Sequence, residues 1–169
     1  MAAGETRRGT VQLLFVRHAD AGDPLAWTGA DADRPLSPKG ERQAERLARH
    51  LEAIGADPDA IISSPRLRAF QTAEAVAGRL GRKTVISDRL AGGLDIDSLG
   101  ELLAEAGEPA RPLLVGHDPD FSWLVSALVG IAGLTVRKGT LVRVDGALPL
   151  VEGACELRWL IPPDALRDR

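Results

Sequence analysis

The chain has 169 residues, of which 44% are hydrophobic and 27% charged, and its formal net charge is −3. These values are ordinary for a globular protein, so they exclude disorder of the body of the chain and predict one domain over residues 1–169. No apolar run approaches the roughly 18–20 residues that span a bilayer, and residues 1–9 lack a signal-peptide pattern, so we expect a cytoplasmic protein without a membrane partner.

The first half of the chain predicts a tail, a strand, a loop and a helix. Residues 1–9 are polar and predict a disordered tail. The continuous apolar run VQLLFV at residues 11–16 is typical of a strand buried on both faces. Residues 19–36 are rich in Ala, Asp and Gly and predict a long loop. Ser37-Pro38 then combines a preferred cap residue with a first-turn proline, and apolar residues follow at helical spacing.

The second half continues to alternate strands and helices. A strand is predicted at residues 60–63, a helix from Ser64-Pro65 to Gly81, and a third strand at residues 84–87. The remaining predicted elements are a short helix at 98–106, a strand at 112–116, a helix from Asp118-Pro119 to Gly130, and strands at 139–144 and 156–161. This alternation predicts an α/β fold of three layers, α/β/α, with a mostly parallel sheet of about six strands.

Three polar motifs fall at the carboxyl ends of the predicted strands, where sheets of this kind bind ligands. The motif LFVRHA places Arg17 and His18 after the first strand, and LLVGHDP places His117 after the fourth. The motif SSPRLRAFQTA puts Arg66 and Arg68 in the first turn of a helix, where cations are unfavourable unless an anion binds there. Taken alone, each motif is also compatible with a simpler interpretation. A histidine in it could be structural, and its arginines could be surface residues, since the chain has many arginines.

Together the motifs predict a cationic pocket, rich in hydrogen-bond donors, without an acidic counterpart of matching regularity. Such a pocket suits a phosphoryl group, whose oxygens the guanidinium groups bind and whose charge they stabilise in the transition state. A neutral histidine in the pocket has a free lone pair and can act as the nucleophile.

The three motifs in this order resemble the histidine phosphatase superfamily, in its phosphoglycerate mutase-like branch, over about residues 11–162. The short length, the stretch Arg17 to Ala21 and the stretch Asp33 to Ser37 are most similar to the SixA type of phosphohistidine phosphatase. The resemblance implies a mutase-like fold, His18 as the phosphorylated nucleophile, and a phosphate pocket completed by Arg17, Arg68 and His117. It also suggests Arg34 as a substrate-binding residue, whereas Arg66 does not match the second arginine of the family.

The function implied is a metal-independent phosphatase that works through a covalent phosphohistidine intermediate. Its expected partner is a phosphorylated protein, such as a histidine phosphotransfer domain, or a small phosphorylated molecule. Two alternatives remain at this point: a phosphoester phosphatase or mutase of the sugar-phosphate kind, and a catalytically dead phosphate-binding module.

One departure from the family separates the first two functions. Ester phosphatases and mutases of this branch carry a glutamate general acid after the third strand, and Ala91 stands where we expect it. A positioned acid is worth roughly 10²–10⁴-fold in rate when the leaving group is poor. Its absence suits a good leaving group such as imidazole, unless a loop carboxylate substitutes, the candidates being Asp20, Asp23, Asp95 and Asp97.

The remaining residue counts restrict other chemistries. One cysteine, Cys155, and three histidines provide no disulfide framework and no ligand set with metal spacing, so we expect neither a metal nor a cofactor. The chain has no basic block, which disfavours nucleic acid as a partner. Trp27, in the long loop, either covers the pocket or packs against the domain.

Overall fold

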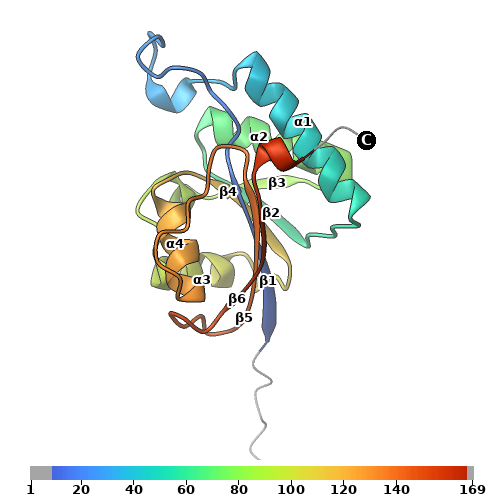
Figure 1. The fold of residues 1–169 in the computed structure, drawn as a ribbon, viewed down its shortest axis with the longest axis vertical. Coiled ribbons are helices and arrows are strands. Elements are labelled where there is room, and N and C mark those ends of the chain that lie inside the picture. Colours follow the sequence, from blue (N-terminus) through green and yellow to red (C-terminus); the bar gives the residue numbers. More distant parts are fainter. Residues whose placement is uncertain (1–8, 167–169) are drawn as a thin grey trace, which may run out of the picture.

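The computed structural model describes residues 9–166, and its centre is one six-stranded sheet (Figure 1). The strand order is β3-β2-β4-β1-β5-β6. The strands are β1 (Thr10–Arg17), β2 (Ala60–Ser63), β3 (Thr84–Ile86), β4 (Pro112–Gly116), β5 (Leu141–Ala147) and β6 (Glu156–Ile161). The first four are parallel, whereas β5 runs antiparallel to β1 and β6 antiparallel to β5. The prediction of a mostly parallel sheet is therefore confirmed.

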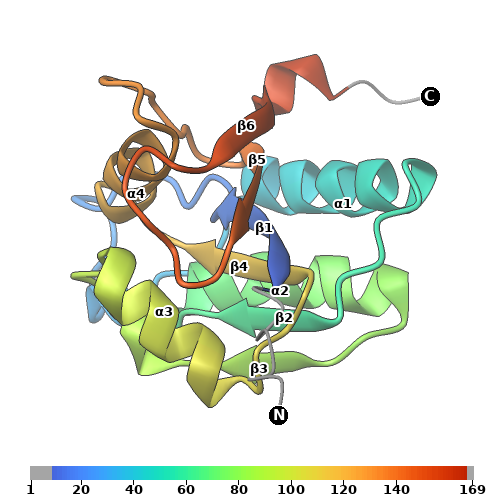
Figure 2. The same ribbon diagram turned by 90° about the horizontal axis from the view of Figure 1, so that it is seen from below.

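Helices cover both faces of the sheet, as predicted. Figure 2 shows α1 (Pro38–Ala53) and α2 (Leu67–Leu80) on one side, with α3 (Ile96–Glu105) and α4 (Asp120–Val129) on the other. Side chains of β1 alternate between the two resulting cores: Leu13 and Phe15 pack with α3 and α4, and Leu14 and Val16 with α1 and α2. Burial on both faces explains why this strand is a continuous apolar run.

The predicted tail lies almost wholly outside the described residues, which begin at Gly9. Of the residues predicted to form it, only Gly9 is described, and its carbonyl accepts a hydrogen bond from the Leu148 backbone N–H. None of the helices within residues 9–166 is both long enough and apolar enough to cross a membrane.

Two helices begin near their predicted residues and are capped by side chains. The Ser37 hydroxyl accepts from the Gly40 N–H at 3.0 Å, and Pro38 is the first helical residue of α1. Helix α3 begins two residues before Ser98, because Asp95 is its cap and Ser98 closes a capping box with it. Each such cap stabilises its helix by about 1 kcal/mol.

The caps predicted for the other two helices, Ser64 and Asp118, are not at the observed cap positions. Helix α2 begins at Leu67, because Arg66 has extended backbone angles and is the cap residue, so only Arg68 lies in the first turn. Helix α4 begins at Asp120, after Pro119. The Asp118 carboxylate lies outside that helix and accepts from the Ser122 N–H and hydroxyl.

Candidate active site

The carboxyl ends of β1, β2 and β4 meet at one edge of the sheet. Arg17 pairs with Gly116, and Ser63 pairs with Val115, so the residues that follow each strand start level with one another. The His18 N–H donates to the Gly116 carbonyl at 3.0 Å, and the Ser64 N–H donates to the Val115 carbonyl at 2.9 Å. The parallel ladder thus extends one residue beyond the strands and holds His18, Ser64 and His117 side by side.

His18 is buried and held in one tautomer. Its Nδ1 lies 2.7 Å from the Ala19 carbonyl oxygen. Because a carbonyl only accepts, Nδ1 must carry the proton, and the lone pair is on Nε2. The pKa of His18 is lowered to about 4, mainly by burial and also by the charges of Arg68 and Arg17, and the hydrogen bond to Ala19 opposes this shift. At neutral pH His18 is therefore a neutral imidazole with a free Nε2.

His117 faces His18, with 5.1 Å between the ring centroids. Its Nε2 lies 2.7 Å from the Ser64 hydroxyl, which also accepts from the Arg66 backbone N–H. The arrangement that satisfies both partners has the Ser64 O–H donating to Nε2, which leaves the His117 proton on Nδ1. The pKa of His117 is lowered to about 3, mainly by burial and also by the neighbouring His18 and Arg68.

The charges of Arg17 and Arg68 act on both histidines, and each guanidinium group is tethered through its terminal nitrogens. Arg17 Nη1 donates to the Val136 carbonyl at 3.0 Å and lies 3.4 Å from the Asp118 carboxylate. Arg68 Nη1 donates to the Asp31 carbonyl at 2.7 Å, and Nη2 to the Asp31 carboxylate at 3.0 Å. Both guanidinium groups are thereby oriented before any ligand binds.

Three buried donors at this edge have no acceptor among the described residues: Arg17 Nε, Arg68 Nε and His117 Nδ1. A buried N–H without a partner is costly, typically about 1–3 kcal/mol, so three together need an explanation. The charges of Arg17 and Arg68 lower the pKa values of both His18 and His117, so these residues lie near one another. An oxyanion in front of His18 Nε2 supplies acceptors for this set.

The prediction of a pocket without an acidic counterpart is wrong, because Asp31 occupies that position. It belongs to a short 3-10 turn, η1 (Asp31–Asp33), and its carboxylate receives Arg34 Nε at 3.1 Å and Arg66 Nη1 at 3.4 Å besides Arg68. The hydrogen bond from Arg34, followed by that from Arg68, keeps the pKa of Asp31 below its usual value. Nothing in the Ala-, Asp- and Gly-rich loop sequence distinguishes this aspartate from its neighbours.

Arg34, the predicted substrate-binding residue, is buried and held by its own loop. Its Nη1 donates to the Ala21 carbonyl at 2.7 Å, and its Nε to Asp31. Arg34 is thus linked to Arg68 through Asp31, which both side chains contact. Trp27 is also bound within this loop, where its indole N–H donates to the Ala30 carbonyl at 2.9 Å.

Three of the four candidate proton donors are committed to other contacts. Asp95 caps α3, and its hydrogen bonds with Ser98 lower its pKa. Asp20 accepts from the Ser37 hydroxyl at 2.6 Å, which is the main reason that its pKa is also lowered. Asp23 accepts from the Leu25 N–H, and Asp97 lies in the first turn of α3. Across residues 9–166, no carboxylate makes a hydrogen bond or ion pair with either site histidine.

Metal binding finds no support in side-chain geometry. No group of three or more His, Cys, Asp or Glu in the described part of the chain is arranged to hold an ion. Cys155 is free and half-buried just before β6, and burial raises the pKa of its thiol.

Comparisons with known proteins identify the family. The sequence profile of the histidine phosphatase superfamily (branch 1) matches residues 13–92, which include Arg17, His18 and Arg68. An uncharacterized protein of Picosynechococcus sp. is 32% identical over 90% of this chain and all of its own length. An 8-oxo-(d)GTP phosphatase of Mycolicibacterium smegmatis is 31% identical in a match that covers 62% of this chain and 33% of that enzyme.

Among solved structures, the protein histidine phosphatase SixA in complex with tungstate superimposes with a TM-score of 0.77. The match covers 93% of this chain and all of SixA at 24% identity, and it shows that the two chains share a fold. The motif order, the profile match and the mutase-like fold agree, and the chain belongs to the histidine phosphatase superfamily (branch 1) and is a phosphatase.

Proposed function

We propose that this phosphatase hydrolyses phosphohistidine on a protein through a phosphoenzyme intermediate at His18, without a metal ion. One observation carries the proposal: three buried N–H donors without acceptors belong to residues that neighbour a neutral imidazole whose Nε2 is free. That geometry suits a tetrahedral oxyanion. The structural neighbour SixA is a protein histidine phosphatase and binds tungstate, another tetrahedral oxyanion.

In the first step, His18 Nε2 attacks phosphorus while the bond to the leaving group breaks, and the leaving group departs with the electron pair. Arg17, Arg68 and His117 donate to the phosphoryl oxygens and stabilise their charge in the transition state. The Nδ1–H that bonds to Ala19 makes phosphorylated His18 a cationic imidazolium. In the second step, water attacks phosphorus, and His18 departs as a neutral imidazole with its Nδ1 proton retained.

The choice of phosphohistidine over an ester rests on the leaving group. An alkoxide needs a proton as it departs, whereas a protonated imidazole leaves without further help. Ala91 closes the 3-10 turn η2 (Asp88–Ala91) where the family glutamate is expected, and the pKa values of Asp20 and Asp95 are lowered, which opposes a role as acid. These features favour phosphoramidates and aryl phosphates over alkyl esters and sugar phosphates.

The test is a substrate panel at neutral pH: a phosphohistidine peptide, p-nitrophenyl phosphate, 3-phosphoglycerate and a sugar phosphate. We expect kcat/KM for the first two to exceed that for the last two by about 10²-fold or more, the scale of one missing general acid. EDTA should leave the activity unchanged, and vanadate should inhibit it. Comparable kcat/KM on the two alkyl esters would assign the protein to the ester phosphatases, and a loss on chelation that Mg²⁺ or Zn²⁺ restores would reject the metal-independent mechanism.

A further inference from the structure

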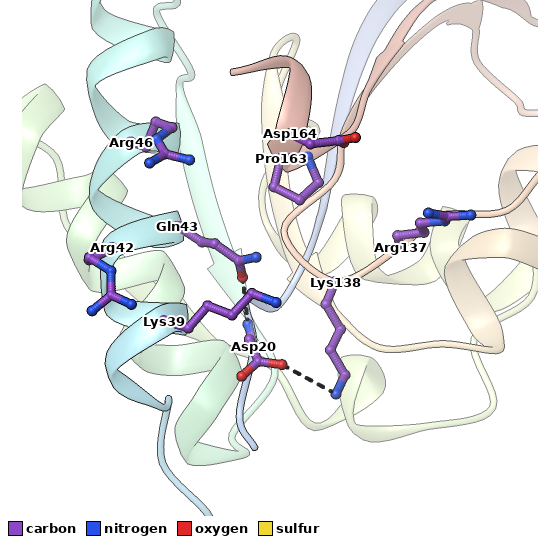
Figure 3. A pocket seen from close by; sticks show the side chains of 9 residues that line it. All are labelled: Asp20, Lys39, Arg42, Gln43, Arg46, Arg137, Lys138, Pro163 and Asp164. Atoms are coloured by element: carbon purple, nitrogen blue, oxygen red, sulfur yellow. Dashed lines mark hydrogen bonds and ion pairs between the residues drawn. The ribbon is translucent and has the colours of Figure 1, made fainter. Parts of the chain in front are cut away.

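A second polar cavity, which we call the basic pocket, lies beside the loop that follows His18 (Figure 3). It has a volume of about 480 Å³ and is lined by five cationic side chains, Lys39, Arg42, Arg46, Arg137 and Lys138, against two carboxylates. The chain as a whole carries a net charge of −3. The basic pocket is therefore a local reversal of the overall charge, and the reaction proposed for His18 does not by itself require it.

The cations lie on two separate walls. One wall is the face of α1, where residues 39, 42 and 46 recur at helical spacing over about 10 Å of the axis. The other is the loop at residues 137–138 with the turn at Pro163 and Asp164. Figure 3 shows Arg42 and Arg137 on opposite walls, with their guanidinium groups pointing apart. This spread fits a partner whose negative charges are themselves spread out better than it fits one compact polyanion.

Much of this charge is not neutralised within the molecule. Lys39, Arg42 and Arg137 are exposed, and their side chains form no hydrogen bond or ion pair with any residue from 9 to 166. Clustered cations without counterions focus a positive potential, which attracts acidic partners and speeds their association by roughly 10–10³-fold. Binding of an acidic group in the basic pocket would therefore neutralise positive charge that is otherwise uncompensated.

The basic pocket also adjoins the candidate active site. Asp20, in its floor, follows His18 by two residues, and its backbone N–H donates to Gln43 of α1 at 2.9 Å. Lys138 lies 3.8 Å from the Asp20 carboxylate, and its charge contributes to the lowered pKa of His18. The next residue, Gly139, donates its N–H to the His18 carbonyl at 3.1 Å. A molecule held in the basic pocket therefore lies next to a phosphoryl group at His18.

We propose that the basic pocket docks an acidic segment that flanks the phosphorylated side chain of a protein substrate. The proposal rests on the proposed function, because the docked protein presents its phosphohistidine to His18. Recognition is by carboxylates distributed along the segment, which pair with Arg42 and Lys39 on α1 and with Arg137 on the opposite loop.

Binding is measured first, with unphosphorylated probes, so that it does not depend on turnover. Two fluorescein-labelled peptides share one sequence around a histidine. One carries glutamates at the flanking positions, and the other carries glutamines at the same positions. Fluorescence anisotropy should show tighter binding of the glutamate peptide, with an affinity that falls as salt is raised from about 0.1 M to 1 M and the screening length shortens. Arg42→Glu and Arg137→Glu should each weaken that binding about 10-fold or more.

Lys83→Glu is the matched control. It makes the same change of charge on an exposed residue just before β3, at the opposite edge of the sheet, and should leave the affinity unchanged. Equal binding of the two peptides, or an equal loss in Lys83→Glu, would overturn the docking proposal. So would strong binding of inorganic tripolyphosphate that Arg42→Glu abolishes while the glutamate peptide fails to bind, because the occupant would then be a small polyanion.

Turnover separates this proposal from the proposed function. With phosphohistidine versions of the two peptides, wild type should show the higher kcat/KM on the acidic one, and Arg42→Glu and Arg137→Glu should remove that difference. Their activity on p-nitrophenyl phosphate should stay at the wild-type value. Turnover of both peptides at one rate would refute the docking proposal alone, and failure to hydrolyse either peptide while p-nitrophenyl phosphate is hydrolysed would refute phosphohistidine as the substrate.

Discussion

The position of one proton on each site histidine determines what the pocket can do. The Ala19 carbonyl places the His18 proton on Nδ1, and the Ser64 hydroxyl does the same for His117. His18 thereby presents a lone pair to phosphorus, and His117 presents an N–H to an oxygen. Protonation of either ring is opposed mainly by burial, with Arg17 and Arg68 adding to the effect.

Titration of the two rings can be measured directly by NMR of protein labelled with ¹⁵N-histidine. Because their pKa values lie at about 4 and about 3, both should keep the shifts of the neutral Nδ1–H tautomer as pH falls from 8 to 5. Ser64→Ala should change the tautomer shifts of His117 and leave those of His18 in place. A midpoint near pH 6.5 for either ring would contradict the burial argument.

The covalent intermediate gives a second test at the residue scale. Rapid quenching with substrate should trap phosphate on His18 as an adduct that is labile to acid and stable to base. His18→Ala should abolish adduct and turnover together, whereas Arg17→Ala or Arg68→Ala should lower kcat by about 10²–10³-fold, the effect of losing one positioned donor. Phosphate found on Cys155 or on an aspartate would identify a different nucleophile.

Among the elements, the start of α1 positions the loop that carries His18. The Ser37 hydroxyl bonds the Asp20 carboxylate at 2.6 Å, and the Ser37 N–H donates to the Asp20 carbonyl at 3.0 Å. Gly40, in the first turn, lies so close that an added Cβ would stand 1.8 Å from that carbonyl oxygen. The helix can approach the loop this closely because residue 40 has no side chain.

Gly40→Ala should therefore both destabilise the protein and lower its activity, because backbone atoms beside His18 must move. Gly78→Ala is the matched control, since Gly78 is exposed in α2 and an added Cβ meets nothing within 4 Å. That control should raise the free energy of unfolding by about 0.5–1 kcal/mol through helix propensity and leave the kinetics unchanged. Urea unfolding and p-nitrophenyl phosphate assays on both variants provide the comparison, and wild-type activity in Gly40→Ala would contradict it.

For the whole molecule, the buried histidines make stability depend on pH. Between pH 7 and pH 5 the unfolded chain takes up protons on its histidines, whereas His18 and His117 stay neutral in the folded state. The unfolded state then binds more protons, so the free energy of unfolding falls as pH is lowered, by about 2 kcal/mol for each of the two residues.

Urea titrations at pH 7 and pH 5, in a buffer free of phosphate and sulfate, should show this loss. His18→Ala should lose roughly half as much as wild type between the two pH values, because one of the two contributions is gone. The same loss in wild type and His18→Ala would mean that His18 titrates normally in the folded protein.

Much of the fold was predictable because local patterns and the tertiary structure agree. Apolar runs in β1 and β4 reflect burial on two faces, and the bounds of β2, β4 and β6 coincide with the predicted ones. The starts of α2 and α4 were predicted less well. Ser64 looks like a cap but bonds His117 instead, and Asp118 accepts from the first-turn Ser122 N–H of α4 from one residue before the cap position.

By itself the sequence determined the order of strands and helices and the edge at which Arg17, His18, Arg68 and His117 gather. It could do so because strand ends and helix starts are local signals, and parallel strands bring their carboxyl ends together. Only the tertiary structure decided which carboxylate orients Arg68 and that cations from α1 and residues 137–138 share one pocket. Asp31 lies 37 residues from Arg68, and Lys39 lies about a hundred from Lys138. Contacts across such separations depend on how the chain packs, and no local spacing encodes them.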